Sequence, residues 1–240
     1  MVIKICHEEA DVFPWTLANE KGLADFEIRS IEKELNIKFD IKILPWKRCQ
    51  TDTQNGIVDG IFAASVSDKR MEWGVYPTAN GKTIEREYRL HTDSFYVYAS
   101  AKKNIKFVNG KIENLHKSAV GIQLGYSIED ELKKAGYKVF SSLITANDVF
   151  TGLSKGTFNA AILQNYEAAH TLNNGSLKKE IIRLEPAYKL ADQYLLFNKL
   201  FYERNKDLSL LIWKAIRKVR LSKEYAELEK KLIETPAKRF

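Results

Sequence analysis

Short apolar runs alternate with amphipathic stretches along the first sixty residues. Runs of four to six residues that are rich in β-branched or aromatic side chains are typical of strands, and apolar residues spaced three and four apart are typical of helices. On this basis the pattern predicts strand, helix, strand, helix and strand at Val2–Cys6, Asp25–Leu35, Phe39–Leu44, Lys47–Asn55 and Asp59–Ala63. Strands that alternate with helices in this way predict a mostly parallel sheet.

A second series of the same kind follows a long extended stretch, Arg86–Ser100, that we expect to leave one lobe and enter another. The pattern predicts strands at Ala119–Gln123, Tyr137–Phe140 and Ala160–Leu163, helices at Ile128–Ala135, Ala146–Ser154 and Glu167–Leu172, extended segments at Ile181–Leu184 and Gln193–Phe197, and closing helices at Leu208–Val219 and Lys223–Leu232. We therefore expect an α/β protein of two lobes, the first from residues 1–95 with 190–240 and the second from residues 96–189.

The two series share a phrase. In Gln54–Phe62 and again in Ser154–Ile162, a predicted helix stops at a glycine, Gly56 or Gly156, and a short apolar strand follows a few residues later. Glycine can take the left-handed conformation that ends a helix. The alternative is that this is a common connection in α/β proteins without functional meaning, since many helices end at a glycine before the next strand. Because open α/β sheets bind ligands beyond the carboxyl ends of their strands, two such lobes predict a cleft between them.

The composition is that of a globular protein. Of 240 residues, 45% are hydrophobic and 29% are charged, which is enough apolar material for two cores. No apolar run approaches the roughly 18 residues that a membrane span needs. No signal peptide is visible either, because Met1–Lys4 leads directly into the first predicted strand.

The net charge of +7 raises the question of nucleic acid. The lysines are spread along all the predicted helices, with a mild concentration in Lys214–Lys231, and this spread favours a solvated basic surface over a nucleic-acid-binding face. A positive field of this kind modestly favours anionic small ligands. The histidines are scattered without metal-ligand spacing, so we expect no metal site and no cofactor: His7, His91, His116 and His170. The chain carries no nucleophile motif or phosphate loop.

Of the two cysteines, Cys6 ends the first predicted strand and Cys49 follows the second. Neighbouring parallel strands end at the same edge, so the two thiols could lie within the Cα separation of about 4.4–6.8 Å that a disulfide needs. Two unpaired thiols are the alternative. A disulfide would indicate an oxidising compartment.

The richest segment for chemistry is Asp59–Arg70. Small residues after the strand allow a ligand to approach the backbone N–H groups, and Ser65 or Ser67 could add a hydroxyl. Arg70 supplies a planar fork that suits a carboxylate. A surface ion pair with Asp68 or Glu72 is the alternative for this arginine.

A second anion-binding position is predicted at Ser127, which follows Gly125 and precedes a predicted helix. Backbone N–H groups and the helix dipole favour an anion there. A simple N-cap is the alternative role for this serine.

The order of elements, the phrase from Gly56 to Arg70, the stretch Val120–Ser127 and the closing helices resemble the periplasmic solute-binding proteins of polar amino-acid ABC transporters, which are extracellular solute-binding protein family 3. Pro45–Cys49 and Trp73–Pro77 resemble a less characterised branch of that family. The resemblance implies the type II periplasmic-binding-protein-like fold, with two mostly parallel sheets joined by two crossover strands. It also implies a non-enzymatic, monomeric protein of the periplasm, whose signal peptide is not part of this chain and whose partner is a membrane permease.

Position by position, the resemblance assigns Arg70 to the ligand carboxylate, with help from Ala64 and Ser65, and Ser127 to the same group from the second lobe. The loop before the arginine is one residue shorter than is usual in the family, which leaves open whether Ser65 or Ser67 points inward.

The chief departure is Gln164, which stands where amino-acid-binding members carry an aspartate for the ligand ammonium. Glutamine cannot neutralise a buried ammonium. Either another acid on the first loop (Asp11, Glu8 or Glu9) takes this role, or the ligand is not a standard α-amino acid.

Four aromatic residues on loops at the predicted cleft edge could stack against a ligand, or could pack within a lobe. The ligand role is favoured for Trp15 and Tyr126, and the two roles are balanced for Phe13 and Trp46. Trp213, on a closing helix, is expected in the core.

Two other functions fit the same fold. The family resembles periplasmic cyclohexadienyl dehydratases, which need a carboxyl group beside the anion-binding groups, and the missing acid at Gln164 argues against this activity. A ligand-sensing domain that reports to a kinase or cyclase is the third possibility.

Overall fold

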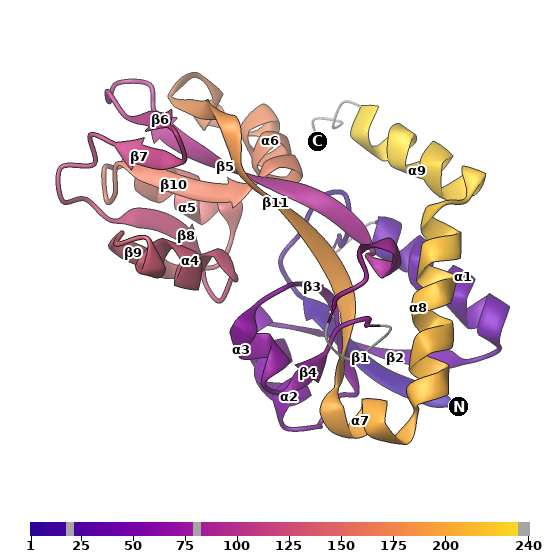
Figure 1. Ribbon diagram of the computed structural model, residues 1–240. Helices are drawn as coiled ribbons and strands as arrows, with labels where there is room; N and C mark the ends of the chain where they lie inside the picture. The colour runs from indigo at the N-terminus through magenta and orange to yellow at the C-terminus, as the bar shows by residue number, and fades with distance from the viewer. Residues whose placement is uncertain (18–21, 79–82, 235–240) are drawn as a thin grey trace. The chain divides into compact units, whose positions relative to one another are not determined.

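The computed structural model describes residues 1–17, 22–78 and 83–234. Within this part the chain divides into two compact units, residues 1–92 with 192–234 (unit 1) and residues 93–191 (unit 2). Two strands cross from one unit to the other along the chain, β5 at His91–Ser100 and β11 at Ile181–Asn198. Figure 1 shows both as long arrows.

Unit 1 is built on strands β2, β1, β3 and β11 in that order, with β4 beside β11. Strand β1 is parallel to β2 and to β3, and β11 is antiparallel to β3 and to β4. The elements of this unit, besides the crossover strands, are β1 Val2–Glu8, α1 Leu23–Leu35, β2 Lys38–Leu44, α2 Trp46–Gln54, β3 Gly60–Ser65, α3 Asp68–Met71, β4 Gly74–Val75, the 3-10 turn η1 Arg86–Tyr88, α7 Lys199–Arg204, α8 Lys206–Arg220 and α9 Lys223–Glu234.

Helix α8 closes the core of unit 1 against β11. The indole Nε1 of Trp213 donates a hydrogen bond of 2.9 Å to the Leu195 carbonyl oxygen, and its ring lies 5.5 Å from that of Phe197. Trp213 is only 1% exposed, so its predicted core position is confirmed. Both its apolar ring and its one polar atom are satisfied inside the unit.

Unit 2 has the strand order β5, β10, β8 and β9. Strand β10 is antiparallel to β5 and parallel to β8, and β8 is parallel to β9. The further elements are the hairpin of β6 Lys106–Val108 and β7 Lys111–Glu113, then β8 Val120–Gln123, α4 Ile128–Lys134, β9 Val139–Leu143, α5 Ala146–Ser154, β10 Ala160–Gln164, α6 Asn165–Asn174 and the 3-10 turn η2 Ser176–Lys179.

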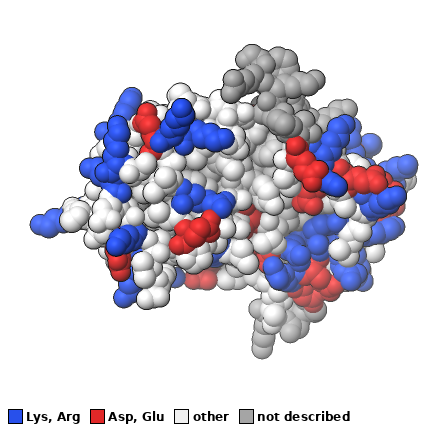
Figure 2. Space-filling view, turned by 90° about the horizontal axis from the view of Figure 1, so that it is seen from above, with Lys and Arg blue, Asp and Glu red and all other residues white. Residues whose placement is uncertain are grey.

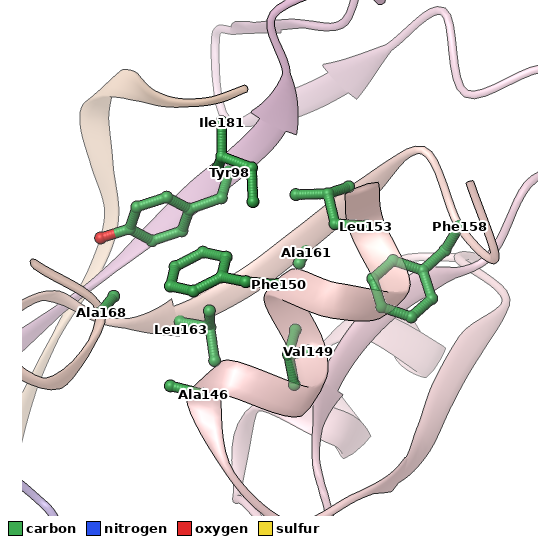
Figure 3. Close-up of a cluster of buried hydrophobic side chains, with 10 residues drawn as sticks. All are labelled: Tyr98, Ala146, Val149, Phe150, Leu153, Phe158, Ala161, Leu163, Ala168 and Ile181. Atoms are coloured by element: carbon green, nitrogen blue, oxygen red, sulfur yellow. The ribbon is translucent and has the colours of Figure 1, made fainter. Parts of the chain in front are cut away.

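The core of unit 2 lies between α5 and the sheet (Figure 3). Helix α5 begins with a capping box, in which Thr145 and Asp148 satisfy each other's backbone N–H groups. One face of this helix then enters the core, where the ring of Phe150 packs edge-on against Tyr98 at 5.2 Å. The cluster comprises Tyr98, Ala146, Val149, Phe150, Leu153, Phe158, Ala161, Leu163, Ala168 and Ile181.

Both copies of the repeated phrase form helix–glycine–strand units. Gly56 and Gly156 have φ values of +70° and +75°, the left-handed conformation predicted for them. A polar residue stands immediately before the strand in each copy, Asp59 before β3 and Asn159 before β10, and forms a hydrogen bond there. The Asp59 carboxylate accepts a hydrogen bond of 2.7 Å from the Lys4 backbone N–H, and the Asn159 backbone N–H donates to the Ser118 hydroxyl at 2.8 Å. In each unit this residue links the start of one strand to a neighbouring segment.

Two predictions of extended structure were wrong in detail. Arg86–Tyr88 forms a 3-10 turn, and the strand begins only at His91. The two segments predicted at the end of unit 2 belong to one continuous strand, β11, because the polar residues and Pro186 between them interrupt the apolar pattern without ending the strand. A crossover strand that is half exposed along much of its length does not show a continuous apolar pattern.

Candidate ligand-binding site

Arg70 lies immediately beyond the carboxyl end of β3. Its side chain is 4% exposed, and its Nη1 donates hydrogen bonds to the Ser65 carbonyl oxygen at 2.7 Å and to the Ser65 hydroxyl at 3.1 Å. Ser65 is the last residue of β3, and Arg70 follows in the short helix α3. The strand end and the next turn therefore hold a buried guanidinium beside a buried hydroxyl.

Two aromatic residues fix this arrangement. The guanidinium carbon of Arg70 lies 5.2 Å from the centre of the Trp46 ring, a cation–π contact. The Tyr76 hydroxyl donates to the same Ser65 carbonyl oxygen at 2.6 Å. Burial raises the pKa of Tyr76 to about 12, so its hydroxyl keeps the proton that it donates. Trp46, for which ligand and packing roles were balanced, thus packs against the arginine.

A β-bulge precedes the site. Ala63 has a φ of +66°, which is unusual for a residue with a Cβ, and the pairing of β3 with β11 shifts between Tyr194 and Leu196. After the bulge, Ala64 pairs with Tyr194 and Ser65 pairs with Gln193. Bulges re-aim the residues that follow them and are common beside functional sites. Here the bulge sets the direction of the Ala64–Ser65 strand end.

Cys6 and Cys49 form a disulfide, with their Cα atoms 5.7 Å apart. Cys6 lies in β1 and Cys49 lies in α2, the helix that begins at Trp46. The covalent link therefore joins the sheet of unit 1 to the helix that contacts Arg70.

In unit 2, a buried network lies at the end of β8. Gln123 donates from Nε2 to Glu167 Oε1 at 3.0 Å, to the Ile144 carbonyl oxygen at 3.2 Å and to the Tyr126 hydroxyl at 3.3 Å. Tyr126, a predicted ligand contact, is 9% exposed and belongs to this network. Sequence reasoning missed Gln123 and Glu167, because a glutamine in a strand and a glutamate in a helix carry no signal of their own.

The other predicted residues of unit 2 lie at helix starts. Ser127 is half-buried at the N-cap position of α4, with Glu129, Asp130 and Glu131 in the first turn. The negative charges of those acids already offset the positive end of the helix dipole, which weakens the case for a bound anion there. Gln164 is 7% exposed and ends β10 immediately before α6.

Asp93 is a buried acid that sequence reasoning missed. It is 2% exposed, and its Oδ1 accepts a hydrogen bond of 2.6 Å from the Ser94 backbone N–H. The backbone N–H groups of Tyr166 and Asn165, in the first turn of α6, act on the carboxylate as weaker donors. Burial raises its pKa to about 7, while these hydrogen bonds act in the opposite direction. An acid therefore lies beside the helix that follows Gln164, contributed by the crossover strand β5.

Two predicted residues of the first loop lie in different surroundings. Trp15 is 2% exposed and stacks on His91, with ring centres 3.6 Å apart and planes inclined by 10°. Burial lowers the pKa of His91 to about 3, so its imidazole is neutral. Trp15 thus packs inside unit 1. Asp11 is exposed, on the loop that follows β1.

Charged side chains of both signs are mixed on the surface of the molecule (Figure 2). Figure 2 shows Lys and Arg side chains interspersed with Asp and Glu over the face in view, and no single basic stripe stands out there. Among the residues that the structure describes, no group of three or more His, Cys, Asp or Glu side chains is placed to hold a metal ion. In the same residues, no helix has both the length and the apolar character needed to cross a membrane.

No protein-family model matches this sequence, and no curated protein matches it either. Solved structures do match along nearly the whole chain. A histidine kinase sensor domain with similarity to periplasmic binding proteins aligns with a TM-score of 0.79 at 13% identity, over 97% of this chain and 96% of that one. The GluR0 ligand-binding core from Nostoc punctiforme, in complex with L-glutamate, aligns with a TM-score of 0.75 at 12% identity, over 97% and 100%.

The substrate-binding protein of an amino acid ABC transporter aligns with a TM-score of 0.72 at 20% identity, over 98% of this chain and 100% of that one. Similarity of this extent shows the fold. The chain has the two-unit α/β fold of periplasmic binding proteins, as predicted, with β5 and β11 as its crossover strands.

Proposed function

We propose that this protein is the solute-binding component of an ABC importer and that Arg70 and Ser65 bind the carboxylate of a small, amino-acid-like ligand. The observation that carries the proposal is the buried Arg70 guanidinium, held at the end of β3 by two hydrogen bonds to Ser65. Open α/β sheets bind their ligands beyond the carboxyl ends of the strands, and Ser65 and Arg70 lie at and just after the carboxyl end of β3.

The chemistry of the pair favours a carboxylate. A guanidinium is planar and carries five N–H donors in a fixed geometry, so it can donate to one or to both oxygens of a carboxylate. Trp46 and Tyr76 restrict the positions that Arg70 and Ser65 can take, so little conformational entropy remains to be lost on binding.

The wider assignment rests on the fold and on the disulfide. The aligned structures include an amino acid ABC transporter protein, and Cys6–Cys49 is the kind of bond that persists in oxidising compartments. We therefore place the protein outside the cytoplasm, in extracellular solute-binding protein family 3, as a monomer that delivers its ligand to a membrane permease. Tyr126, Ser127 and Gln164 stay proposed ligand contacts from unit 2. Binding, and no catalysis, is the proposed activity.

Native mass spectrometry of freshly purified protein tests this proposal. We expect a fraction of the protein to carry a small molecule of amino-acid size, released on denaturation and identified by its mass. Protein that is free of any such molecule, and that is not stabilised against heat by any member of a panel of amino acids and related carboxylates, would contradict the proposal.

A sensing role is the second candidate, and one observation favours it: a histidine kinase sensor domain aligns over 97% of the chain. Loss of the gene separates the two functions. If the protein serves import, cells without it lose uptake of the ligand. If it serves sensing, uptake continues and the cellular response to the ligand disappears.

A further inference from the structure

Gln193 carries a buried donor that no described residue of the protein uses. This residue of β11 is 3% exposed, and among the described residues its Nε2 has no hydrogen-bond partner. The backbone of Gln193 is satisfied, because its carbonyl oxygen accepts a hydrogen bond of 2.8 Å from the Leu90 N–H. The amide nitrogen is therefore the group that needs a partner. Buried donors without partners are rare in folded proteins, because such a donor loses its hydrogen bonds to water and gains none in the protein.

The sheet register places this side chain next to the proposed carboxylate site. Gln193 pairs directly with Ser65 across the antiparallel strands β11 and β3. Side chains of directly paired residues project from the same face of a sheet, with Cβ atoms about 4.5–5.5 Å apart. The Ser65 hydroxyl in turn lies 3.1 Å from the Arg70 Nη1. A glutamine side chain is long enough to reach a group that Arg70 and Ser65 hold.

The residues after Gln193 in β11 pack into the core of unit 1. The residues that follow it in β11 are buried and mainly apolar: Tyr194, Leu195, Leu196 and Phe197. Tyr194 packs edge-on against Tyr76 at 5.8 Å, so this segment already fits the core of unit 1. The unsatisfied amide nitrogen is the exception in this well-packed segment, which points to a role for Gln193 other than packing.

We propose that Gln193 donates from Nε2 to the ligand carboxylate, so that one carboxylate oxygen is held by Arg70 and Ser65 and the other by the Gln193 amide. This inference rests on the proposed function, since it concerns the same ligand group. It defines the ligand chemistry further: a planar group with two oxygen acceptors, one for a cationic donor and one for a neutral donor.

Five proteins test this inference: wild type, Gln193→Met, Gln193→Glu, Arg70→Gln and the control Gln54→Met, which alters an exposed glutamine of the same unit. The probes are L-glutamate, L-arginine and L-glutamine, which cover negative, positive and neutral side chains, each with its α-carboxamide analogue. Affinities come from calorimetric titration, and melting temperatures of the ligand-free proteins are measured in parallel.

We expect Gln193→Met to weaken binding of the best acid probe about ten- to a hundredfold, the range for losing a hydrogen bond to a charged group. Gln193→Glu should weaken it further, because two carboxylates would then face each other. Without ligand, Gln193→Met should melt roughly 3–8 °C higher, since it removes the unsatisfied donor. Gln54→Met should match wild type in both measurements.

The results that overturn the inference differ from those that overturn the proposed function. If Arg70→Gln loses binding while Gln193→Met keeps it within about twofold, a difference worth less than a typical hydrogen bond, the inference is wrong and the proposed function stands. Tighter binding by Gln193→Glu would show that position 193 accepts a hydrogen bond from a donor on the ligand, which also overturns the inference. If wild type carries no co-purified small molecule and binds none of the probes or related carboxylates, the proposed function fails and the inference fails with it.

Discussion

The Arg70 guanidinium and the Tyr76 hydroxyl donate to one acceptor, the Ser65 carbonyl oxygen, at 2.7 Å and 2.6 Å. One backbone oxygen thus joins the proposed ligand-binding arginine to the surrounding core. Because that oxygen ends β3, any loss of this contact should affect both the stability of unit 1 and the position of Arg70.

Tyr76→Phe tests this relationship. The variant keeps the ring contact with Tyr194 and loses only the hydroxyl, so we expect its free energy of unfolding to fall by about 1 kcal/mol, the usual net value of one hydrogen bond. Urea denaturation measures the change. Tyr202→Phe, on α7, is the matched control. Equal stability of Tyr76→Phe and wild type would show that the hydroxyl contributes nothing.

The disulfide should contribute strongly to stability. Cys6 and Cys49 are separated by 43 residues, and closing a loop of that length lowers the entropy of the unfolded chain by about 4 kcal/mol in free-energy terms. We expect a reductant to lower the melting temperature of wild type and to leave the double variant Cys6→Ser/Cys49→Ser unchanged. A wild-type melting temperature that does not respond to reductant would contradict the bond.

Gly121 in β8 should not tolerate a side chain. A Cβ at this position would lie 2.3 Å from the Phe158 ring, which is far below contact distance. Gly121→Ala should therefore destabilise the protein by about 1–3 kcal/mol through overpacking. Gly56→Ala is the informative comparison, because open space surrounds that position and only its φ of +70° opposes the change.

Phe158→Leu identifies the cause of that loss. Combined with Gly121→Ala, it should recover part of the lost stability, because the ring that collides with the new methyl group is gone. Strictly additive effects of the two substitutions, measured by urea denaturation, would show that the Phe158 ring is not what excludes a side chain at position 121.

Asp93 should make the protein less stable as the pH rises. Its pKa is raised from an ordinary value of 3.8 to about 7 in the folded state, so the folded protein binds this proton more tightly than the unfolded chain does. The free energy of unfolding therefore falls between about pH 4 and pH 7, by roughly 4 kcal/mol for a shift of this size.

Asp93→Asn should remove that part of the pH dependence, since asparagine cannot ionise and its amide oxygen can still accept the hydrogen bond from the Ser94 N–H. Urea denaturation of both proteins between pH 4.5 and pH 7.5 measures the two slopes. The variant should gain stability relative to wild type as the pH rises. Parallel curves would mean that Asp93 ionises normally.

Much of this structure follows from local sequence pattern. The helix–glycine–strand phrases at Gly56 and Gly156, the helix Ala146–Ser154 and the core position of Trp213 were predicted because each depends on residues close in the sequence. The proximity of Ser65 and Arg70 was also within reach, since five residues separate them.

The rest depends on pairings between distant segments. Gln193 lies beside Ser65 only because β11 returns from unit 2 to pair with β3, and no local pattern specifies that register. In the sequence, Asp93 is one polar residue among several in an extended stretch. Its contact with α6 depends on how β5 pairs with β10, which local sequence does not specify. An aromatic residue on a loop, such as Trp15, fits a ligand contact and packing equally well by sequence. Its stacking partner His91 lies 76 positions further along the chain.

Calorimetric titration of the co-purified ligand, or of the best probe, into wild type and Arg70→Gln tests the central claim most directly. Lys69→Gln, an exposed neighbour in the same helix, is the control. We predict that Arg70→Gln weakens binding by at least about thirtyfold, the lower range for breaking a buried charged pair, and that Lys69→Gln binds as wild type does. A folded Arg70→Gln protein with wild-type affinity would contradict the account.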